Sequence, residues 1–297
     1  MKIAISGASG MIGSALLPVL RGSGHEVLRL VRHEPSSADE ARWDPSGSLD
    51  PAVLADVDAV IHLAAPGVGD KRWTDSYKRE LHDARVLGTT TIAKAIAAAS
   101  PRPRVLLSAS AVGYYGDTGD HPADESAPLG SGFLAELCEE WEAAAQPAAD
   151  AGTRVVLLRT GLVLTGHGGL LAQLAVPFKF GIGGKLGSGR QYMPWISLRD
   201  EIGAIEFLLA ADSVSGPVNL AAPNPVTNAE FTRALGAALH RPAVLPIPGI
   251  AVRAIAGELA NEAALIGQRA IPTKLLEHGY QFQDTELEPT LREALAK

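Results

Sequence analysis

Short apolar runs alternate along the chain with longer stretches that are rich in alanine and leucine. The short runs predict strands at residues 2–6, 26–31, 59–63, 104–107, 154–158 and 218–220, and the longer stretches predict helices at residues 11–21, 75–99 and 133–149. Most of these strands are apolar at nearly every position, as strands covered on both faces are. The alternation therefore predicts an α/β fold with a doubly wound parallel sheet of the Rossmann type.

The alternation ends after Thr160. Glycines crowd residues 166–189 around Lys185 and Arg190, so we expect no regular structure there. A loop over a binding cleft is favoured, because long ordered loops tend to be functional, and a flexible excursion is the alternative.

Helical signals return in the last third of the chain. Thr227 and Glu230 have the spacing of a capping box, which predicts a helix beginning near Thr227. Residues 246–297 are predicted to form helices interrupted by prolines and glycines. The predicted organisation is a Rossmann domain at 1–165 with a returning segment near 195–222, and a smaller, mainly helical substrate-side part made of a loop region at 166–194 and a C-terminal cap at 223–297.

Composition narrows the class of protein. Hydrophobic residues make up 46% and charged residues 20% of the 297 residues, a balance typical of soluble globular enzymes. The formal net charge of -7 argues against a nucleic-acid partner. Cys138 is the only cysteine, so the chain can form neither an intrachain disulfide nor a cysteine-based metal site. With no signal peptide and no apolar run of about 18 residues, we expect a cytoplasmic protein with no metal and no membrane partner.

A glycine-rich turn follows the first predicted strand. Its sequence is Gly7-Ala8-Ser9-Gly10-Met11-Ile12-Gly13, and a helical pattern starts at once. Such glycines let the backbone approach a dinucleotide pyrophosphate, which the N–H groups at a helix start attract, and let the helix and strand pack closely. An ordinary tight turn is the alternative, but it explains one glycine better than three. The predicted cofactor contacts here are Gly7, Ser9, Gly10, Met11, Ile12 and Gly13.

The end of the second predicted strand indicates which dinucleotide binds. NAD-binding proteins place an acidic residue there, which accepts hydrogen bonds from the ribose. This chain has Arg32-His33 instead, and a guanidinium can meet a 2′-phosphate with charge-assisted bonds. We therefore predict NADP, although Arg32 could be a solvated surface charge and the nearby Glu34 weakens the signal. Asp44, after the next probable strand, is a candidate acceptor for the adenine amino group.

Several short motifs are spread over nearly the entire chain. They are Gly7–Gly13, Trp43-Asp44, Arg72-Trp73, residues 108–116, Trp141-Glu142, residues 187–191 and Pro194-Trp195-Ile196. Together they resemble the extended short-chain dehydrogenase/reductases related to nucleotide-sugar epimerases. The match is closer to an atypical branch, the "epimerase family" proteins that carry a C-terminal domain of unknown function. The resemblance implies the Rossmann fold and a bound dinucleotide.

The resemblance assigns further residues to the cofactor. Leu63 and Ala64 match a contact at the end of the fourth strand, and Val163 is a candidate backbone contact to the nicotinamide amide. Arg85 stands where typical members have the Asn of Asn-Val-x-Gly-Thr, so it could contact a cofactor phosphate instead. Glu80 lies on the same predicted helix, where it could pair with Arg85, reach the cofactor or form a solvated ion pair.

The same resemblance shows a departure at the catalytic centre. Typical members carry a Ser at the end of the fifth strand and a Tyr-x-x-x-Lys pair on the next helix, where the tyrosine exchanges protons with the substrate. Ser110 fits the serine position, with Ser108 as a competitor, but the helix at residues 133–138 offers neither tyrosine nor lysine. Tyr114 or Tyr115 could bring a phenol to the nicotinamide from the loop side, or could pack that loop against the cleft.

Two functions are compatible with these residues. The first is an NADP-dependent oxidoreductase or epimerase, whose small polar or nucleotide-linked substrate lies between the sheet and the C-terminal cap. The second is a non-enzymatic NADP-binding regulator, in which the bound cofactor orders the glycine-rich region for a partner. The first function is preferred, the missing Tyr-x-x-x-Lys pair is what raises the second, and a homodimer is compatible with either. The predicted substrate contacts are Lys185, Arg190, Gln191 and Trp195.

Overall fold

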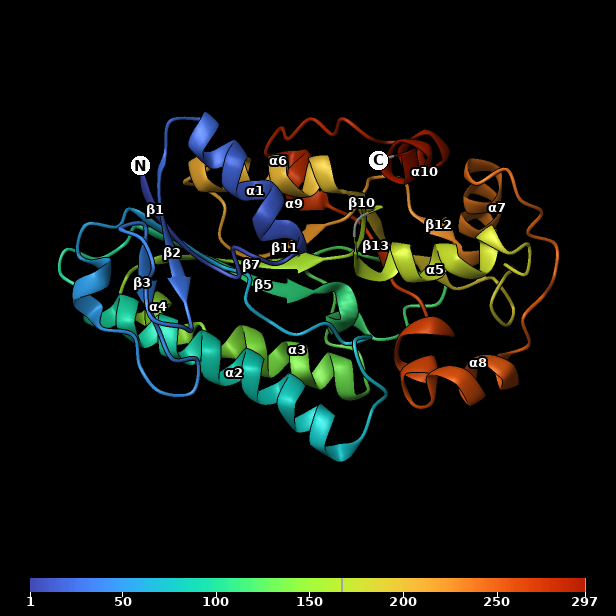
Figure 1. Ribbon diagram of the computed structural model, residues 1–297, viewed down its shortest axis with the longest axis horizontal. Coiled ribbons are helices and arrows are strands. Elements are labelled where there is room, and N and C mark those ends of the chain that lie inside the picture. Colours follow the sequence, from blue (N-terminus) through green and yellow to red (C-terminus); the bar gives the residue numbers. More distant parts are fainter. Residues whose placement is uncertain (167, 297) are drawn as a thin grey trace.

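A parallel sheet lies at the centre of the protein, in the strand order β11-β7-β5-β4-β1-β2-β3 (Figure 1). The computed structural model describes residues 1–166 and 168–296; His167 and Lys297, which fall in the predicted loop and cap, lie outside the described residues. The order reverses direction between β1 and β4, which confirms the predicted doubly wound Rossmann-type sheet and puts the switch point there. The strands are β1 (Lys2–Ser6), β2 (Glu26–Val31), β3 (Glu40–Arg42), β4 (Ala59–His62), β5 (Val105–Ala111), β7 (Arg154–Thr160) and β11 (Gly216–Leu220).

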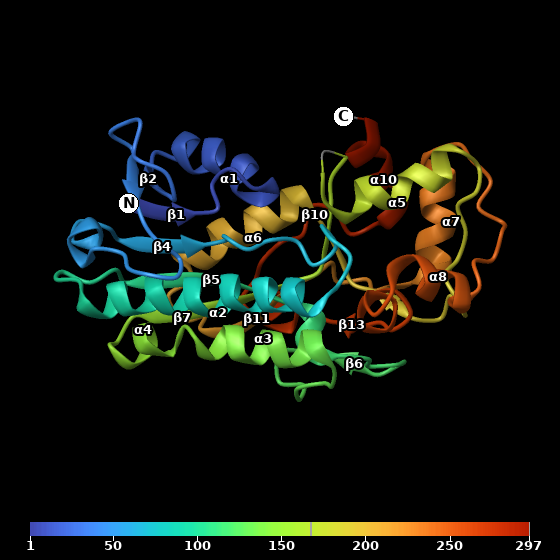
Figure 2. The same ribbon diagram turned by 60° about the horizontal axis from the view of Figure 1, so that its bottom comes forward.

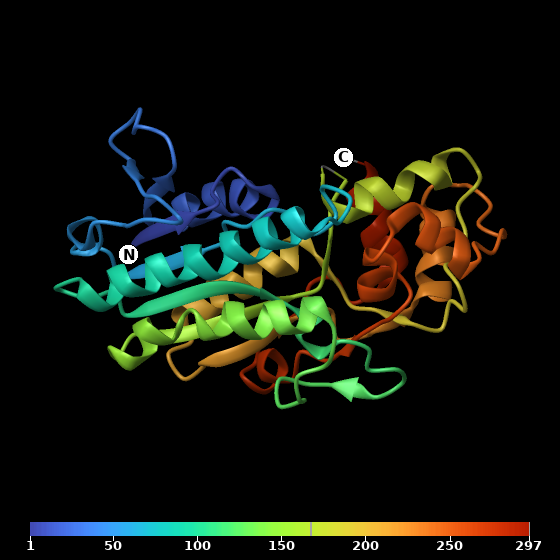
Figure 3. The same cartoon turned by 90° about the horizontal axis from the view of Figure 1, so that it is seen from below.

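Helices cover both faces of this sheet (Figure 2, Figure 3). One layer contains α1 (Met11–Gly22) and α6 (Leu198–Ala210), and the other contains α2 (Asp75–Ala98), α3 (Phe133–Ala143) and α4 (Gln146–Asp150), with the short η1 (Pro51–Leu54) before β4. Side chains along a strand alternate between the layers: Ile3 and Ile5 of β1 join the core beneath α1 and α6, whereas Ala4 joins the core beneath α2. Each face of the sheet is therefore covered by a packed core, and the two cores hold the carboxyl ends of the strands in place.

The predicted helix at residues 133–149 is two helices. Helix α3 ends at Ala143, and α4 starts at Gln146 with Pro147 in its first turn. Proline has no N–H group and is tolerated in the first turn of a helix, so Pro147 marks a new helix.

A smaller, mainly helical part lies beyond the carboxyl edge of the sheet (Figure 1). It shares an apolar core that includes Phe178, Phe231 and Leu291. Its helices are α5 (Gly169–Lys179), α7 (Asn228–Ala238), α8 (Gly249–Ala256), the π-helix η3 (Ala260–Ala264) and α10 (Leu287–Ala296), and its paired short strands are β8 (Leu162–Leu164) with β10 (Trp195–Ser197) and β9 (Tyr192–Met193) with β12 (Val226–Thr227).

Helix α5 lies inside the region for which we predicted no regular structure, so that prediction is wrong for Gly169–Lys179. The glycines flank this segment, and its buried residues Leu171, Ala175 and Phe178 recur at helical spacing. The glycine-rich residues 181–189 that follow form no helix or strand, as expected.

The end of the chain returns to the sheet. The predicted capping box is confirmed at α7, where Thr227 and Glu230 bond each other's backbone N–H groups. Farther on, β13 (Arg269–Ala270) pairs with β6 (Pro122–Ala123), and α9 (Thr273–Glu277) packs against β11. Among the described helices, none is both long and apolar enough to span a membrane.

Candidate cofactor site

The predicted phosphate loop closes against the end of β4. Gly7 has a φ of +75°, and a Cβ atom on it would lie 2.7 Å from the carbonyl carbon of Leu63 and 2.8 Å from the amide nitrogen of Ala64. A Cβ atom on Gly13 would lie 2.2 Å from the carbonyl oxygen of Gly7. No described side chain caps the start of α1 at Gly10, so the first N–H groups of the helix remain available to an anion. The loop thus fits a pyrophosphate.

Buried and exposed side chains flank this loop. Ser9 is exposed on the turn, and Met11 and Ile12 are half-buried in the first turn of α1. Beneath the loop, the hydroxyl oxygen of Ser6 lies 2.6 Å from Nδ1 of His62. Burial lowers the pKa of His62 to about 4, so this ring is neutral and supports the junction of β1 and β4.

Arg32 lies exposed directly after β2, as the prediction of a 2′-phosphate contact requires. It forms no ion pair with any described residue. Glu34, which could have neutralised it, is paired with Arg42. Asp44 is also exposed, and its Oδ1 accepts hydrogen bonds from the backbone N–H and the hydroxyl of Ser46 at 3.0 and 3.1 Å, so this carboxylate shapes a local turn.

Arg85 lies beneath the loop that follows β4. Its Nη2 donates to the carbonyl oxygen of Pro66 at 2.8 Å, its guanidinium lies 4.9 Å from the ring centre of Trp141, and its pKa is lowered by burial. Of the alternatives for Glu80, the structure shows the surface ion pair, with Lys71 at 2.8 Å. Arg85 therefore fixes the backbone near Ala64 by a direct contact with the chain.

A buried hydrogen-bond network lies at the ends of β5, β7 and β11. Ser110 donates to Oε1 of Glu142 at 2.7 Å. Arg159 donates to Oε1 and Oε2 of the same carboxylate at 2.7 and 2.8 Å, and to the hydroxyl oxygen of Tyr115 at 3.0 Å. Tyr115 in turn donates to Oδ1 of Asn219 at 2.7 Å. Side chains from five different elements are thereby held in one arrangement.

The two candidate tyrosines of η2 (Val112–Tyr115) have different surroundings. Tyr115 is 3% exposed, and burial raises the pKa of its hydroxyl to about 12. Tyr114 is half-buried, with its ring centre 3.5 Å from the central carbon of the Arg159 guanidinium. Burial also raises the pKa of Cys138, on α3, to about 12, so this side chain acts as a small hydrophobic residue. Ser108 is fully buried and has no hydrogen-bond partner among the described residues.

The predicted substrate residues differ in their access to a ligand. Lys185 and Arg190 are exposed in the glycine-rich segment. Gln191 is half-buried, and its Nε2 donates to two backbone carbonyls at 3.0 Å each, so it holds neighbouring segments together. Trp195 is 1% exposed and packs in the core of the C-terminal part, where a ligand would not reach it. Val163 is also buried, in the core beneath α1 and α6.

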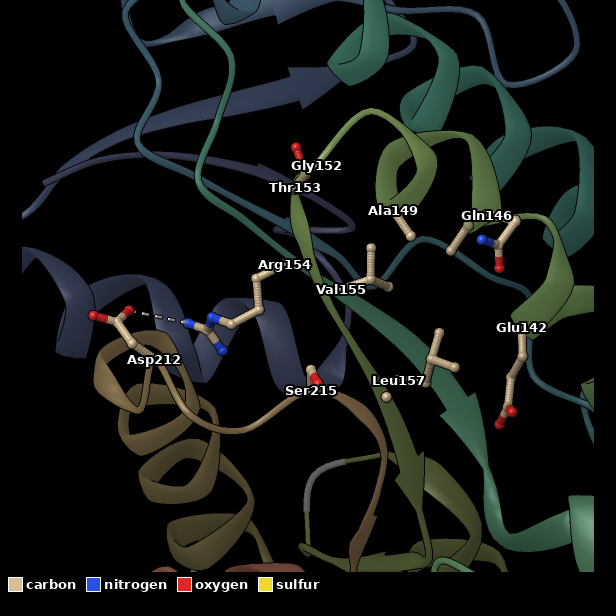
Figure 4. Close-up of a pocket in the computed structure, with 12 residues that line it drawn as sticks. Glu142, Gln146, Ala149, Gly152, Thr153, Arg154, Val155, Leu157, Asp212 and Ser215 are labelled. Atoms are coloured by element: carbon tan, nitrogen blue, oxygen red, sulfur yellow. Dashed lines mark ion pairs between the residues drawn. The ribbon is translucent and has the colours of Figure 1, made fainter.

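A groove opens on the sheet away from these residues (Figure 4). It has a volume of about 550 Å³, and its lining includes Arg154, Val155 and Leu157 of β7, with Glu142 at its margin. Arg154 donates to backbone carbonyls at the end of α6 at 3.1–3.2 Å, so its guanidinium caps the C-terminus of that helix. None of the predicted cofactor or substrate residues lines this groove.

The network contains three residues to which the sequence analysis gave no role: Glu142, Arg159 and Asn219. Arg159 and Asn219 lie within strands whose apolar pattern predicts burial, and buried charged or amide groups need partners. A charged or amide residue inside an apolar strand was therefore the available signal of a buried network. Its partners could not be predicted, because they come from distant parts of the chain.

Two protein-family models match the chain, one over the part that forms the central sheet and one near the C-terminus. Residues 3–221 match the NAD dependent epimerase/dehydratase family, and residues 247–294 match a domain of unknown function, DUF1731. An epimerase family protein of Mycobacterium bovis is 50% identical over 294 residues, which cover 99% of this chain and 96% of that protein.

Two solved structures extend the comparison. The crystal structure of the human epimerase family protein SDR39U1 with NADPH has a TM-score of 0.90 at 35% identity, covering 100% of this chain and 99% of that chain. A structure described as the nucleoside-diphosphate sugar epimerase from Corynebacterium glutamicum has a TM-score of 0.83 at 36% identity, covering 99% of this chain and 58% of that chain. The matches confirm the predicted resemblance, and this chain belongs to the NAD dependent epimerase/dehydratase family, with a C-terminal DUF1731 domain.

Proposed function

We propose that this protein is an NADP-dependent oxidoreductase or epimerase that acts on a small polar or nucleotide-linked compound. The observation that carries the cofactor assignment is the exposed guanidinium of Arg32 at the end of β2, where an acidic residue would favour NAD. Glu34 does not cancel this charge, because it is paired with Arg42. The NADPH in the structure of the human relative supports the same cofactor.

The residues at the carboxyl edge fit a dinucleotide laid across β1 and β4. The N–H groups at the start of α1 and the bare backbone of Gly7 would hold the pyrophosphate, and Arg32 the 2′-phosphate. Arg85 acts from beneath, because its bond to Pro66 fixes the backbone that would face the ribose. Bound NADP supplies a hydride acceptor or donor.

Tyr114 is our candidate for the group that exchanges a proton with the substrate. Its hydroxyl forms no hydrogen bond within the described residues, whereas the Tyr115 hydroxyl both donates and accepts in the buried network. The Ser110 hydroxyl donates its hydrogen bond to Glu142, so its oxygen can accept a hydrogen bond from a substrate hydroxyl.

The substrate would lie between the carboxyl edge of the sheet and the C-terminal part. Lys185 and Arg190 are exposed cations there and suit phosphate or carboxylate groups. A nucleotide-linked substrate agrees with the description of the Corynebacterium glutamicum relative. We further propose a cytoplasmic protein that works on this small molecule and can form a homodimer.

Calorimetric titration of NADPH and NADH against the unmutated protein and Arg32→Ala tests the cofactor assignment. We expect Arg32→Ala to weaken NADPH binding by roughly tenfold to a hundredfold, because a charge-assisted phosphate contact contributes about 1.5–3 kcal/mol. NADH binding should hardly change. The matched control is Arg104→Ala, which removes an exposed arginine just before β5, at the opposite edge of the sheet. Equal binding of the two cofactors, or equal weakening of both, would remove the NADP assignment.

A non-enzymatic NADP-binding regulator is the second candidate. It is favoured by the side chains that α3 presents to the loop at Gly113, which are Leu134 and Cys138 and not the usual tyrosine and lysine. A Cβ atom added to Gly113 would lie 3.6 Å from Cβ of Leu134 and 3.8 Å from Sγ of Cys138. Offering NADPH and NADP with a panel of carbonyl compounds, alcohols and nucleotide sugars separates the candidates. Turnover of any compound supports the enzyme, and tight cofactor binding with no turnover supports the regulator.

A further inference from the structure

The guanidinium of Arg159 is a buried cation with a fixed orientation. Its side chain is 3% exposed, and that of its partner Glu142 is 9% exposed. Burial alone would lower the pKa of Arg159, but the hydrogen bonds and the negative charge of Glu142 outweigh burial and raise it. The two bonds to the carboxylate form a bidentate pair, which sets the plane of the guanidinium as well as its position.

The directions of the neighbouring hydrogen bonds are determined by Asn219. Its Nδ2 donates to the carbonyl oxygens of Ala123 and Ile271, at 3.2 and 2.9 Å, so its Oδ1 is left to accept. The Tyr115 hydroxyl donates a hydrogen bond to that oxygen at 2.7 Å, so toward Nη1 of Arg159 it can only accept. All three nitrogens of the guanidinium are thus bonded.

The flat face of this fixed cation lies against Tyr114. The ring centre is 3.5 Å from the central carbon of the guanidinium, well within the range of a cation–π contact. Since the Tyr114 hydroxyl has no hydrogen bond among the described residues, the direction of this phenol is set by the stacking of its ring.

We infer that Arg159 is a positioning residue for Tyr114 and that it acts in place of the lysine that α3 lacks. The inference rests on the proposed function, in which Tyr114 would exchange a proton with the substrate beside the nicotinamide. Glu142 and Tyr115 hold the guanidinium, and the guanidinium holds the phenol. Ile271, in the DUF1731 domain, orients Asn219, so the C-terminal domain helps to set this geometry.

The test uses the fluorescence of bound NADPH, because the emission of the nicotinamide reports its surroundings without any turnover. Arg159→Lys keeps the charge but loses the planar, bidentate contact. We expect its Kd for NADPH to stay within about threefold of the unmutated value, since the phosphate contacts are intact. The emission of the bound state should change in the same direction as in Tyr114→Ala. Tyr115→Phe, which leaves the Arg159–Glu142 pair whole, should give a smaller change of the same kind.

The matched control is Arg154→Lys, the same replacement in the same strand, at a guanidinium that caps α6 and does not contact Tyr114. It should leave the bound emission unchanged. If Arg159→Lys and Tyr115→Phe bind NADPH with the unmutated emission, the positioning role is overturned and the proposed function stands. If the unmutated protein binds no NADPH, the proposed function fails first, and this inference fails with it.

Turnover adds a second readout once a substrate is found. We expect Arg159→Lys to lower kcat by about tenfold or more with little change in KM, because a positioned proton donor contributes about 10²–10⁴-fold. Tyr114→Phe should lower kcat as well, and the double variant should be no slower than Tyr114→Phe alone. Independent, additive losses in the double variant would contradict the coupling of Arg159 to Tyr114.

Discussion

Glu201 holds a carboxyl group in the interior of the protein, with no charged partner in the described part of the chain. It is fully buried on α6, its Oε1 accepts a hydrogen bond from the hydroxyl of Thr160 at 3.0 Å, and its Oε2 has no partner among the described residues. Burial raises the pKa of this group to about 8. At neutral pH the side chain is therefore protonated, which avoids the cost of an unpaired buried charge.

The free energy of unfolding should consequently fall as the pH rises toward 8. The unfolded chain releases this proton near the ordinary pKa of 4.5, whereas the folded protein keeps it up to about pH 8. Deprotonation thus stabilises only the unfolded chain across this window, and the effect levels off above it. From about pH 6.5 to 8 the loss is about 2 kcal/mol, at roughly 1.4 kcal/mol per pH unit.

Urea unfolding of Glu201→Gln at several pH values measures this contribution. The variant should lack this part of the pH dependence and so lose less stability between about pH 6.5 and 8 than the unmutated protein. Glu206→Gln, on the same helix but partly exposed, is the control and should keep the full slope. The same slope in Glu201→Gln and the unmutated protein would show that Glu201 is ionised in the fold.

At the scale of elements, the sequence predicted what depends on contiguous residues. The phosphate loop is one short motif, and the strands are local apolar runs, so both could be recognised. Helix α5 was missed because glycines on both sides hide its apolar spacing. The buried network was missed because its members are distant in sequence: the Tyr115–Asn219 bond joins residues 104 positions apart. Nothing local to Arg159 shows that Glu142 from α3 meets it.

The contact between the phosphate loop and β4 gives a prediction about Gly7. An alanine there would adopt an unfavourable positive φ and would place its Cβ 2.7 Å from the backbone of Leu63. We expect Gly7→Ala to cost at least about 1 kcal/mol more than Gly24→Ala, which has a similar φ of +79° but nothing within 4 Å of the added atom. Thermal unfolding measures this difference.

Cofactor titration completes the comparison of the two glycines. Gly7→Ala should bind NADPH much more weakly, because the loop must move away from β4 and from the pyrophosphate position. Gly24→Ala should bind it normally. Normal NADPH affinity in Gly7→Ala would mean that the cofactor does not approach this backbone.

On the scale of the whole molecule, the C-terminal segment joins the two parts of the protein. Asp200 on α6 is fully buried and accepts hydrogen bonds from the hydroxyl of Tyr280 and from the backbone N–H groups of Gln283 and Asp284, at 2.8–3.0 Å. Leu275 of α9 is buried in the core beneath α1 and α6. The segment is therefore part of the fold of the Rossmann domain as well as of the C-terminal part.

Removal of the residues after Pro246 should therefore give insoluble protein, or soluble protein that binds NADPH poorly. The truncation would expose the core that Leu275 covers, remove the donors of the C-terminal segment from the buried Asp200, and take away the Ile271 carbonyl that orients Asn219. Full-length Asp200→Ala is the milder comparison: it should stay soluble but lose about 3 kcal/mol of stability, because several buried donors lose their acceptor. Solubility, thermal unfolding and NADPH titration of both proteins measure these effects. A truncated chain that stays soluble, unfolds cooperatively and binds NADPH with the unmutated affinity would show that the Rossmann domain is complete without this segment.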